Sequence, residues 1–288
     1  MAQFQPQKLF PAIQGVTSHW DFISSSVSPW RKRQVAKTIL SNARLQPRWQ
    51  EVSPVRAHAD WVVYFLFSPD NEFTSAHEYS LSRLKDSGNK IYLVCACPRA
   101  ESIPQRVYDF ADALSWKALD GYDFSAYKLA LGQIALKSPG ANVLVLNDSV
   151  FGPFVDMNLA SLQTSWELTG FTGSAEIENH LQSYAFILKE VTPSRLRQLA
   201  TVFMPFIALS TPQDVIDCQE SRLARVASQS MSVGAYWFSD RVNPTLYFPE
   251  ELIRAGHPFL KKALLGKSKT FQEPERMLTL LEQFKHPH

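Results

Sequence analysis

Three short runs of apolar residues constrain the fold of this chain more than any other feature. They are Trp61–Phe67 (WVVYFLF), Ile91–Ala96 (IYLVCA) and Val143–Leu146 (VLVL). Continuous apolar runs of this length are typical of strands that are buried on both faces. Helical patterns at Ser75–Ser87 and Asp123–Lys137 separate them. The alternation predicts an α/β domain with a mostly parallel central sheet and right-handed crossovers.

The remaining elements follow a looser pattern. Between the second and third strands, Tyr108–Leu114 favours a further helix. Beyond Pro153 we expect strands at Trp166–Thr172 and Tyr184–Leu188 and an extended segment at Asn243–Phe248. Helices are predicted at Ser194–Phe203, Asp214–Gln229 and Pro249–Ala255.

The first part of the chain differs from the rest, and we divide the sequence into residues 1–58, 59–267 and 268–288. Residues 1–58 are predicted to form a partly helical arm, with a helix at Pro29–Arg44 that Ser28 caps. The cluster Arg31-Lys32-Arg33 and nearby tryptophans allow two interpretations, an arm packed on the main domain or an interfacial helix near lipid. The short apolar face favours packing. The last segment is expected to be a helical tail.

Composition excludes several classes of protein. Of the 288 residues, 45% are hydrophobic, which is enough for a sizeable core. The net charge of +2 gives no indication of a nucleic-acid partner. Three cysteines without a CxxC pair favour neither a disulfide framework nor a zinc site. Met1–Gly15 does not resemble a signal peptide, and no run reaches the ~18 apolar residues of a membrane span, so we expect a cytoplasmic protein.

Polar residues directly follow the predicted strands. Ser68 and Asp70 follow the first strand, and Asn147, Asp148 and Ser149 follow the third. In open parallel sheets, ligands bind beyond the carboxyl ends of the strands. Because it comes straight after four apolar residues, Asp148 is the first choice for a functional carboxylate.

The segment Asp120–Lys128 (DGYDFSAYK) begins the predicted helix that precedes the third strand. Asp123 is the expected N-cap, and Gly121, next to Tyr122, would allow a close approach of the backbone. The free N–H groups of a helix N-terminus suit a diphosphate, to which Lys128 would add positive charge. The alternative is an ordinary capped helix with a solvated lysine.

Four strings occur in the order and spacing of rhamnan synthesis protein F domains: LDGYDFSAYKLAL, VLVLNDSVFGPF, NHLQSYAFIL and NPTLYFPEELIRAGHPFLKKALL. From about Trp61 to about Lys267 the chain therefore resembles that family. The resemblance implies a GT-A-like nucleotide-diphospho-sugar transferase domain. It also implies a rhamnosyltransferase-like activity in the synthesis of lipopolysaccharide or another cell-wall polysaccharide.

The resemblance places Asn147-Asp148-Ser149 where better-known relatives carry a metal-binding Asp-x-Asp. This sequence has one carboxylate where two are expected. Mg²⁺ and Mn²⁺ prefer several hard oxygen ligands. Either Asp148 holds a single metal ion together with diphosphate oxygens, or Lys128 and the helix N-terminus replace the ion.

The catalytic assignment rests on Glu220 and Asp148. Glu220-Ser221-Arg222-Leu223 resembles a Glu-x-x-Leu segment of the family, which implies that Glu220 is the base for the acceptor hydroxyl. Glu176 and Glu178 are rival candidates.

The string HLQSY suggests a sugar or acceptor site. Alternation would send His180, Gln182 and Tyr184 to one face of a strand, where they would recognise hydroxyl groups. A buried His180 with satisfied hydrogen bonds is the alternative.

These inferences lead to two hypotheses. In the first, the chain transfers a deoxyhexose, rhamnose by resemblance, from a nucleotide diphosphate sugar to a growing cell-surface polysaccharide. The glycan acceptor would be lipid-linked, and the chain would lie in the cytoplasm, peripheral at the inner face of a bacterial membrane. In the second, it is a non-catalytic sugar-nucleotide or glycan-binding subunit of a polysaccharide assembly complex.

Overall fold

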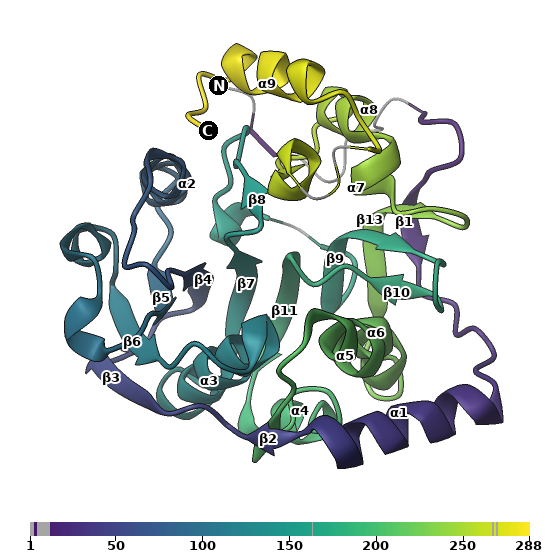
Figure 1. Cartoon of the computed structure of the whole chain (residues 1–288), viewed down its shortest axis with the longest axis horizontal. Coiled ribbons are helices and arrows are strands. Elements are labelled where there is room, and N and C mark those ends of the chain that lie inside the picture. The colour runs from purple at the N-terminus through teal and green to yellow at the C-terminus, as the bar shows by residue number, and fades with distance from the viewer. Residues whose placement is uncertain (1–2, 5–11, 163, 267, 269) are drawn as a thin grey trace.

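The computed structural model describes residues 3–4, 12–162, 164–266, 268 and 270–288. These residues form a mixed ten-stranded sheet in the order β1-β13-β9-β11-β7-β4-β5-β6-β3, with β10 paired to β9 (Figure 1). The strands of this sheet are β1 (Thr17–Asp21), β3 (Trp49–Ser53), β4 (Asp60–Phe67), β5 (Ile91–Ala96), β6 (Ala113–Lys117), β7 (Ala141–Asn147), β9 (Leu168–Ser174), β10 (His180–Leu181), β11 (Ala185–Val191) and β13 (Val233–Ser239).

Two short antiparallel pairs lie outside the main sheet. They are β2 (Arg44–Leu45) with β12 (Ile207–Ala208), and β8 (Val150–Phe151) with β14 (Leu260–Lys261). The helices are α1 (Pro29–Asn42), α2 (Ser75–Asp86), α3 (Tyr122–Lys137), α4 (Pro193–Gln198), α5 (Pro212–Val215), α6 (Ser221–Ala227), α7 (Pro244–Tyr247), α8 (Pro249–Arg254) and α9 (Pro274–Gln283). A π-helical turn at Ile216–Glu220 joins α5 to α6, and 3₁₀ turns lie at Ala100–Ser102, Gln105–Asp109, Leu159–Ser161 and Lys262–Leu265.

The middle of the sheet is parallel, as the apolar runs predict. β7, β4, β5 and β6 are parallel neighbours, and the antiparallel β11 connects them to the parallel pair β9 and β13. Side chains of β4 alternate between the hydrophobic cores on the two faces of the sheet. Val63 and Phe65 pack in the core that contains α3, whereas Val62 and Leu66 pack in the core that contains α2. Burial on both faces explains why the run is continuously apolar. The predicted α/β class with a largely parallel central sheet is confirmed.

Two predicted elements are wrong. Tyr108–Leu114 is not a helix: a 3₁₀ turn ends at Asp109, and Ala113 begins β6. Parallel pairing of β6 with β5 outweighs the helical pattern there. Asn243–Phe248 is not extended, because α7 occupies most of it. Asn243 Oδ1 accepts a hydrogen bond from Thr245 N, and Pro244 takes the first helical position, both of which favour a helix start.

The N-terminal segment is joined closely to the main sheet. Ser28 caps α1 as predicted, accepting from Arg31 N. On either side of α1, β1 pairs with β13 and β3 pairs with β6, so residues 1–58 supply both edge strands. At the other end, α9 lies in the segment predicted as a helical tail; Lys267, at the predicted boundary, lies outside the described residues.

No helix in the described part of the chain is long and apolar enough to span a membrane.

Gly234 allows β13 to pack beneath an aromatic ring. A Cβ atom at this position would overlap the indole of Trp166, whose Nε1 donates to Asp21 Oδ1. We therefore predict that Gly234→Ala lowers the free energy of unfolding by about 1–3 kcal/mol, because the buried ring must shift. Chemical denaturation would measure the loss.

Gly132→Ala is the matched control. Gly132 lies inside α3, and nothing lies within 4 Å of a Cβ added there. Alanine in a helix interior should raise the free energy of unfolding by about 0.5–1 kcal/mol. If both substitutions changed stability in the same direction, the packing explanation for Gly234 would be wrong.

Candidate active site

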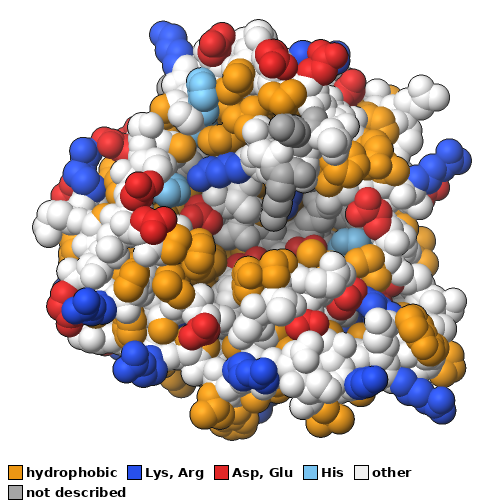
Figure 2. All heavy atoms as spheres, in the orientation of Figure 1, with side chains coloured by type: hydrophobic (Ala, Val, Ile, Leu, Met, Phe, Trp, Pro, Cys, Tyr) orange, Lys and Arg blue, Asp and Glu red, His pale blue; other side chains and the backbone are white. Residues whose placement is uncertain are grey.

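A cavity of about 540 Å³ opens at the carboxyl ends of β4 and β7. Figure 2 shows it as a hollow at the centre of this face, with acidic side chains along it. Its described lining residues come from the ends of central strands, the start of α3, the segment before β11, α5 with the π-helical turn after it, the α7 region, and the β14 region. They are Phe65, Phe67, Tyr122, Asp123, Asn147, Asp148, Ser149, Ser183, Tyr184, Pro212, Val215, Ile216, Glu220, Asn243, Leu246, Lys261, Ala263 and Ser268.

Asp148 is fixed at the end of β7 by the neighbouring strand. Its Oδ2 accepts a hydrogen bond of 2.9 Å from Phe67 N, and His77 Nε2 lies 3.8 Å from the same oxygen. Burial raises the pKa of Asp148 to about 6, although the positive charge of Lys262 and the Phe67 amide act in the opposite direction. The position predicted from the sequence as a cleft carboxylate therefore lies in the cavity.

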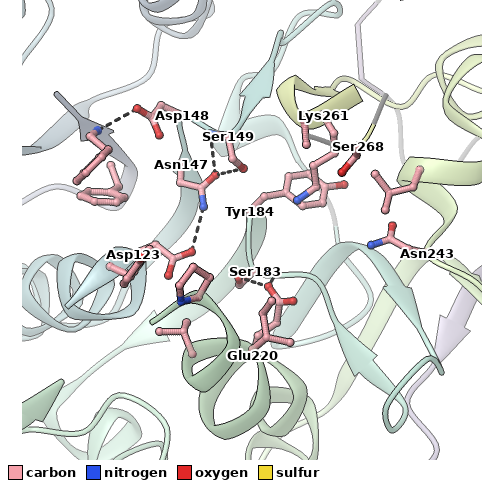
Figure 3. A pocket seen from close by; sticks show the side chains of 18 residues that line it. Asp123, Asn147, Asp148, Ser149, Ser183, Tyr184, Glu220, Asn243, Lys261 and Ser268 are labelled. Carbon is pink, nitrogen blue, oxygen red and sulfur yellow. Dashed lines mark hydrogen bonds between the residues drawn. The ribbon is translucent and has the colours of Figure 1, made fainter. Parts of the chain in front are cut away.

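Asp123 and Asn147 form the next part of the site (Figure 3). Asn147 Nδ2 donates to Asp123 Oδ2 at 3.1 Å, while Asn147 Oδ1 accepts from the hydroxyl and the amide of Ser149. Burial, and then the negative charge of Glu220, raise the pKa of Asp123 to about 6. Asn147 thus orients a carboxylate that is easily protonated.

The start of α3 differs from the prediction in one respect. Asp123 is not the N-cap; Gly121 occupies that position with φ of 83°, and Asp123 lies inside the first turn. Asp123 Oδ1 accepts from Phe124 N, so a carboxylate already faces the first amides of the helix, where we had predicted a diphosphate. A Cβ at Gly121 would lie 2.8 Å from Ser125 Oγ, so only glycine fits.

Glu220 reaches the cavity from the opposite wall, on the π-helical turn between α5 and α6. Its Oε2 accepts hydrogen bonds from Ser183 N, at 3.0 Å, and from Ser183 Oγ (Figure 3). Single π-helical turns are frequent at functional sites. The rival carboxylates lie outside the lining: Glu176 accepts from Asn243 N, and Glu178 forms an ion pair with Arg225.

The remaining predicted residues divide between the cavity, the core and the surface, where Asp70 is exposed and Lys128 is half-buried. Tyr122 and Tyr184 line the cavity, and Tyr122 adopts a left-handed φ of 49° there. The other predicted residues lie outside the described lining: Gly121, which shapes the start of α3, Ser68, Asp70, Lys128, His180 and Gln182. His180 and Gln182 are buried beside β9: His180 pairs with Ser174, and Gln182 N donates to Thr172 O.

The core residues of this group have partners of their own. Ser68 Oγ donates to Glu72 O, His180 Nδ1 lies 2.7 Å from Glu178 O, and Gln182 Oε1 accepts from Thr172 Oγ1. The buried, satisfied histidine matches the alternative that the alternating pattern left open.

Two lysines near the site were not predicted. Lys261 lines the cavity with its Nζ 4.4 Å from the centre of the Tyr184 ring, a cation–π distance. Lys117 is buried behind Phe65 and donates to the Ala118 and Asp120 carbonyls; burial lowers its pKa to about 7. The string HPFLKKALL contains Lys261, but only the fold brings it to the cavity that Asp148 also lines.

A metal site is not evident from the protein side chains alone. Across the described ranges, no three His, Cys, Asp or Glu side chains are grouped as a metal centre would require.

The raised pKa of Asp148 predicts how the free energy of unfolding depends on pH. Between about pH 4 and pH 6 the folded state holds a proton that the unfolded state has lost, so the free energy of unfolding falls as pH rises. Asp148→Asn removes this penalty and can still accept from Phe67 N. We expect the variant to gain about 1–3 kcal/mol over wild type at pH 7 and little at pH 4. Urea denaturation at several pH values would measure it; a pH-independent difference would contradict the assignment.

Known proteins similar to this chain are found among solved structures. No family model and no curated protein matches the sequence. Among solved structures, galactosyltransferase LgtC in complex with donor and acceptor sugar analogues has a TM-score of 0.42 at 9% identity, over 79% of this chain and 97% of that one.

Two further solved structures are similar at the same level. The inositol-1-phosphate CTP transferase from T. maritima has a TM-score of 0.40 at 9% identity, over 69% of this chain and 97% of that one. The putative nucleotide-diphospho-sugar transferase from Desulfovibrio desulfuricans G20 has a TM-score of 0.38 at 10% identity, over 78% and 96%. The resemblance to rhamnan synthesis protein F domains stays a prediction.

Proposed function

We propose that the chain is a glycosyltransferase that moves a sugar from a nucleotide diphosphate to an acceptor hydroxyl. The observation that carries this proposal is the convergence of Asp123, Asp148 and Glu220 on one cavity that also contains Lys261. The four side chains come from separate elements and meet where an open parallel sheet binds its ligands. A site with carboxylates and a cation supplies both a base and a partner for a departing phosphate.

Glu220 is the proposed base. Ser183 holds one carboxylate oxygen with two hydrogen bonds, which fixes the orientation of the group. Glu220 would take the proton of the acceptor hydroxyl while the acceptor oxygen bonds to the anomeric carbon of the donor. The bond from that carbon to the diphosphate oxygen breaks, and the electron pair leaves with the diphosphate. Lys261 would stabilise the charge that develops there.

Asp148 and Asp123 are the proposed donor-side carboxylates. Asp148 would accept from donor hydroxyls or act as the protein ligand of Mg²⁺ or Mn²⁺ bound to the diphosphate. When bound, such an ion would supply Lewis-acid stabilisation of the leaving group. Asp123, oriented by Asn147, would accept from a sugar hydroxyl on the α3 side of the cavity.

The cavity also supports a proposal about the sugar and the acceptor. Apolar side chains form much of the wall, including Phe65, Phe67, Val215 and Leu246. Flat apolar surfaces suit a nucleobase and the methyl group of a deoxyhexose. With the rhamnan synthesis resemblance, this favours a deoxyhexose such as rhamnose as the donor sugar. The acceptor would be a lipid-linked glycan of cell-surface polysaccharide synthesis, at the inner membrane of a bacterium.

Substitution of the proposed base tests the function directly. Glu220→Gln should lower the rate of transfer by about 10²–10⁴-fold, because the amide cannot accept the proton. Asp148→Ala should also lower transfer and donor hydrolysis. Product formation from a panel of nucleotide sugars, followed by chromatography, measures both.

Asp70→Asn is the control for these variants, because Asp70 is exposed and lies outside the described cavity lining. It should keep wild-type activity. Full activity of both Glu220→Gln and Asp148→Ala would show that the assignment of these residues to the active site is wrong. Donor binding without turnover of any nucleotide sugar would favour the non-catalytic subunit instead.

A thermal-shift panel tests donor recognition without requiring turnover. A ligand at about 100 times its Kd raises the free energy of unfolding by about 2.7 kcal/mol. We expect nucleoside diphosphates to raise the Tm of the protein and matching nucleosides to raise it less. Lys261→Ala should remove most of the difference in Tm shift between diphosphates and nucleosides. Repeating the panel with Mn²⁺ would measure whether donor binding depends on a metal ion. Equal shifts for nucleosides and diphosphates would contradict a diphosphate site beside Lys261.

A further inference from the structure

One edge of the molecule, formed by α1 and the β2–β12 pair, carries an unusual concentration of positive charge. Residues 29–50 include six Arg or Lys and no Asp or Glu, although the whole chain has a net charge of only +2. Arg31 forms an ion pair of 2.7 Å with Asp217. The other five basic residues are exposed: Lys32, Arg33, Lys37, Arg44 and Arg48.

The same edge exposes large apolar side chains. The exposed fractions are 87% for Leu40, 82% for Leu45, 79% for Phe206 and 69% for Trp30. Leu45 and Phe206 belong to the same two-stranded pair, because Leu45 pairs with Ile207 and Gln46 N donates to Phe206 O. Figure 1 shows α1 and β2 side by side along the lower margin of the molecule. Apolar groups gathered at an edge, unlike scattered ones, mark an interaction surface.

We propose that this basic-apolar edge docks on the surface of an anionic lipid bilayer. Lysine and arginine are attracted to anionic headgroups, and tryptophan favours the interface between headgroups and acyl chains. Leucine and phenylalanine tips would enter the boundary of the acyl region. A nucleic acid would match the charge but leave Leu40, Leu45 and Phe206 in water. None of these side chains lines the cavity, so the inference does not depend on the proposed activity.

Docking there would bring the cavity wall close to the lipid. The inner side of α1 contacts the segment from α5 to the π-helical turn, through Arg31 with Asp217 and Asn42 Nδ2 with Asp214 Oδ2 at 3.0 Å. Ile216 and Glu220 of the same segment line the cavity. One segment therefore lies between the proposed lipid surface and the proposed base, which suits an acceptor that is anchored in the bilayer.

Vesicle co-sedimentation with the full chain tests the proposal. Wild type should bind vesicles of phosphatidylglycerol and phosphatidylcholine in equal amounts, more weakly as salt rises, and should not bind pure phosphatidylcholine. Lys32→Gln/Arg33→Gln/Lys37→Gln should bind about tenfold to a hundredfold more weakly. Leu40→Ser/Leu45→Ser/Phe206→Ser should lose about tenfold without a change in net charge.

A matched variant separates the edge from exposure in general. Arg99→Gln/Tyr108→Ser removes one exposed cation and one exposed aromatic side chain between β5 and β6, and it should bind vesicles like wild type. Circular dichroism and thermal unfolding check that each variant is folded. Three results would each overturn the proposal: no wild-type binding to anionic vesicles, wild-type affinity in both edge variants, or tighter binding to single-stranded RNA than to vesicles.

Discussion

The parallel pairing of β4 with β7 is the constraint on which the candidate site depends. In this register Phe65 lies opposite Asn147. Asp148 N donates to Phe65 O at 3.0 Å, and Phe67 N donates back to the Asp148 carboxylate. Both hydrogen bonds hold the residue after β7 against the end of β4. The position of Asp148 at the cavity is therefore a property of the strand register rather than of a loop.

The electrostatics of the cavity explain what kind of ligand it can accept. Asp123, Asp148 and Glu220 line the cavity. Burial raises the pKa of both aspartates, and the negative charge of Glu220 adds to the shift of Asp123. A nucleotide diphosphate adds more negative charge. The binding of this proposed donor would therefore require additional positive charge, which Lys261 would provide from the cavity wall and a divalent ion could increase.

The sequence predicts the central strands because their burial on both faces leaves a continuous apolar signal. It also indicates the cleft position of Asp148, since polar residues after such a strand must leave the sheet at one edge. It does not predict β6, whose strand conformation comes from pairing with β5. Nor does it bring Lys261 to Tyr184 or Glu220 to Ser183, because these contacts join segments far apart in the chain. Local patterns carry little information about such pairs.

Both edge strands of the sheet come from the N-terminal segment, and this has a consequence for how the protein is made. Thr17 of β1 pairs with Phe238 of β13, so β1 has no partner until nearly the whole chain has been synthesised. Contacts of such sequence separation are slow to form, and unpaired strands invite association between chains. Until β13 has been synthesised, β1 is therefore an unpaired strand that can associate with other chains.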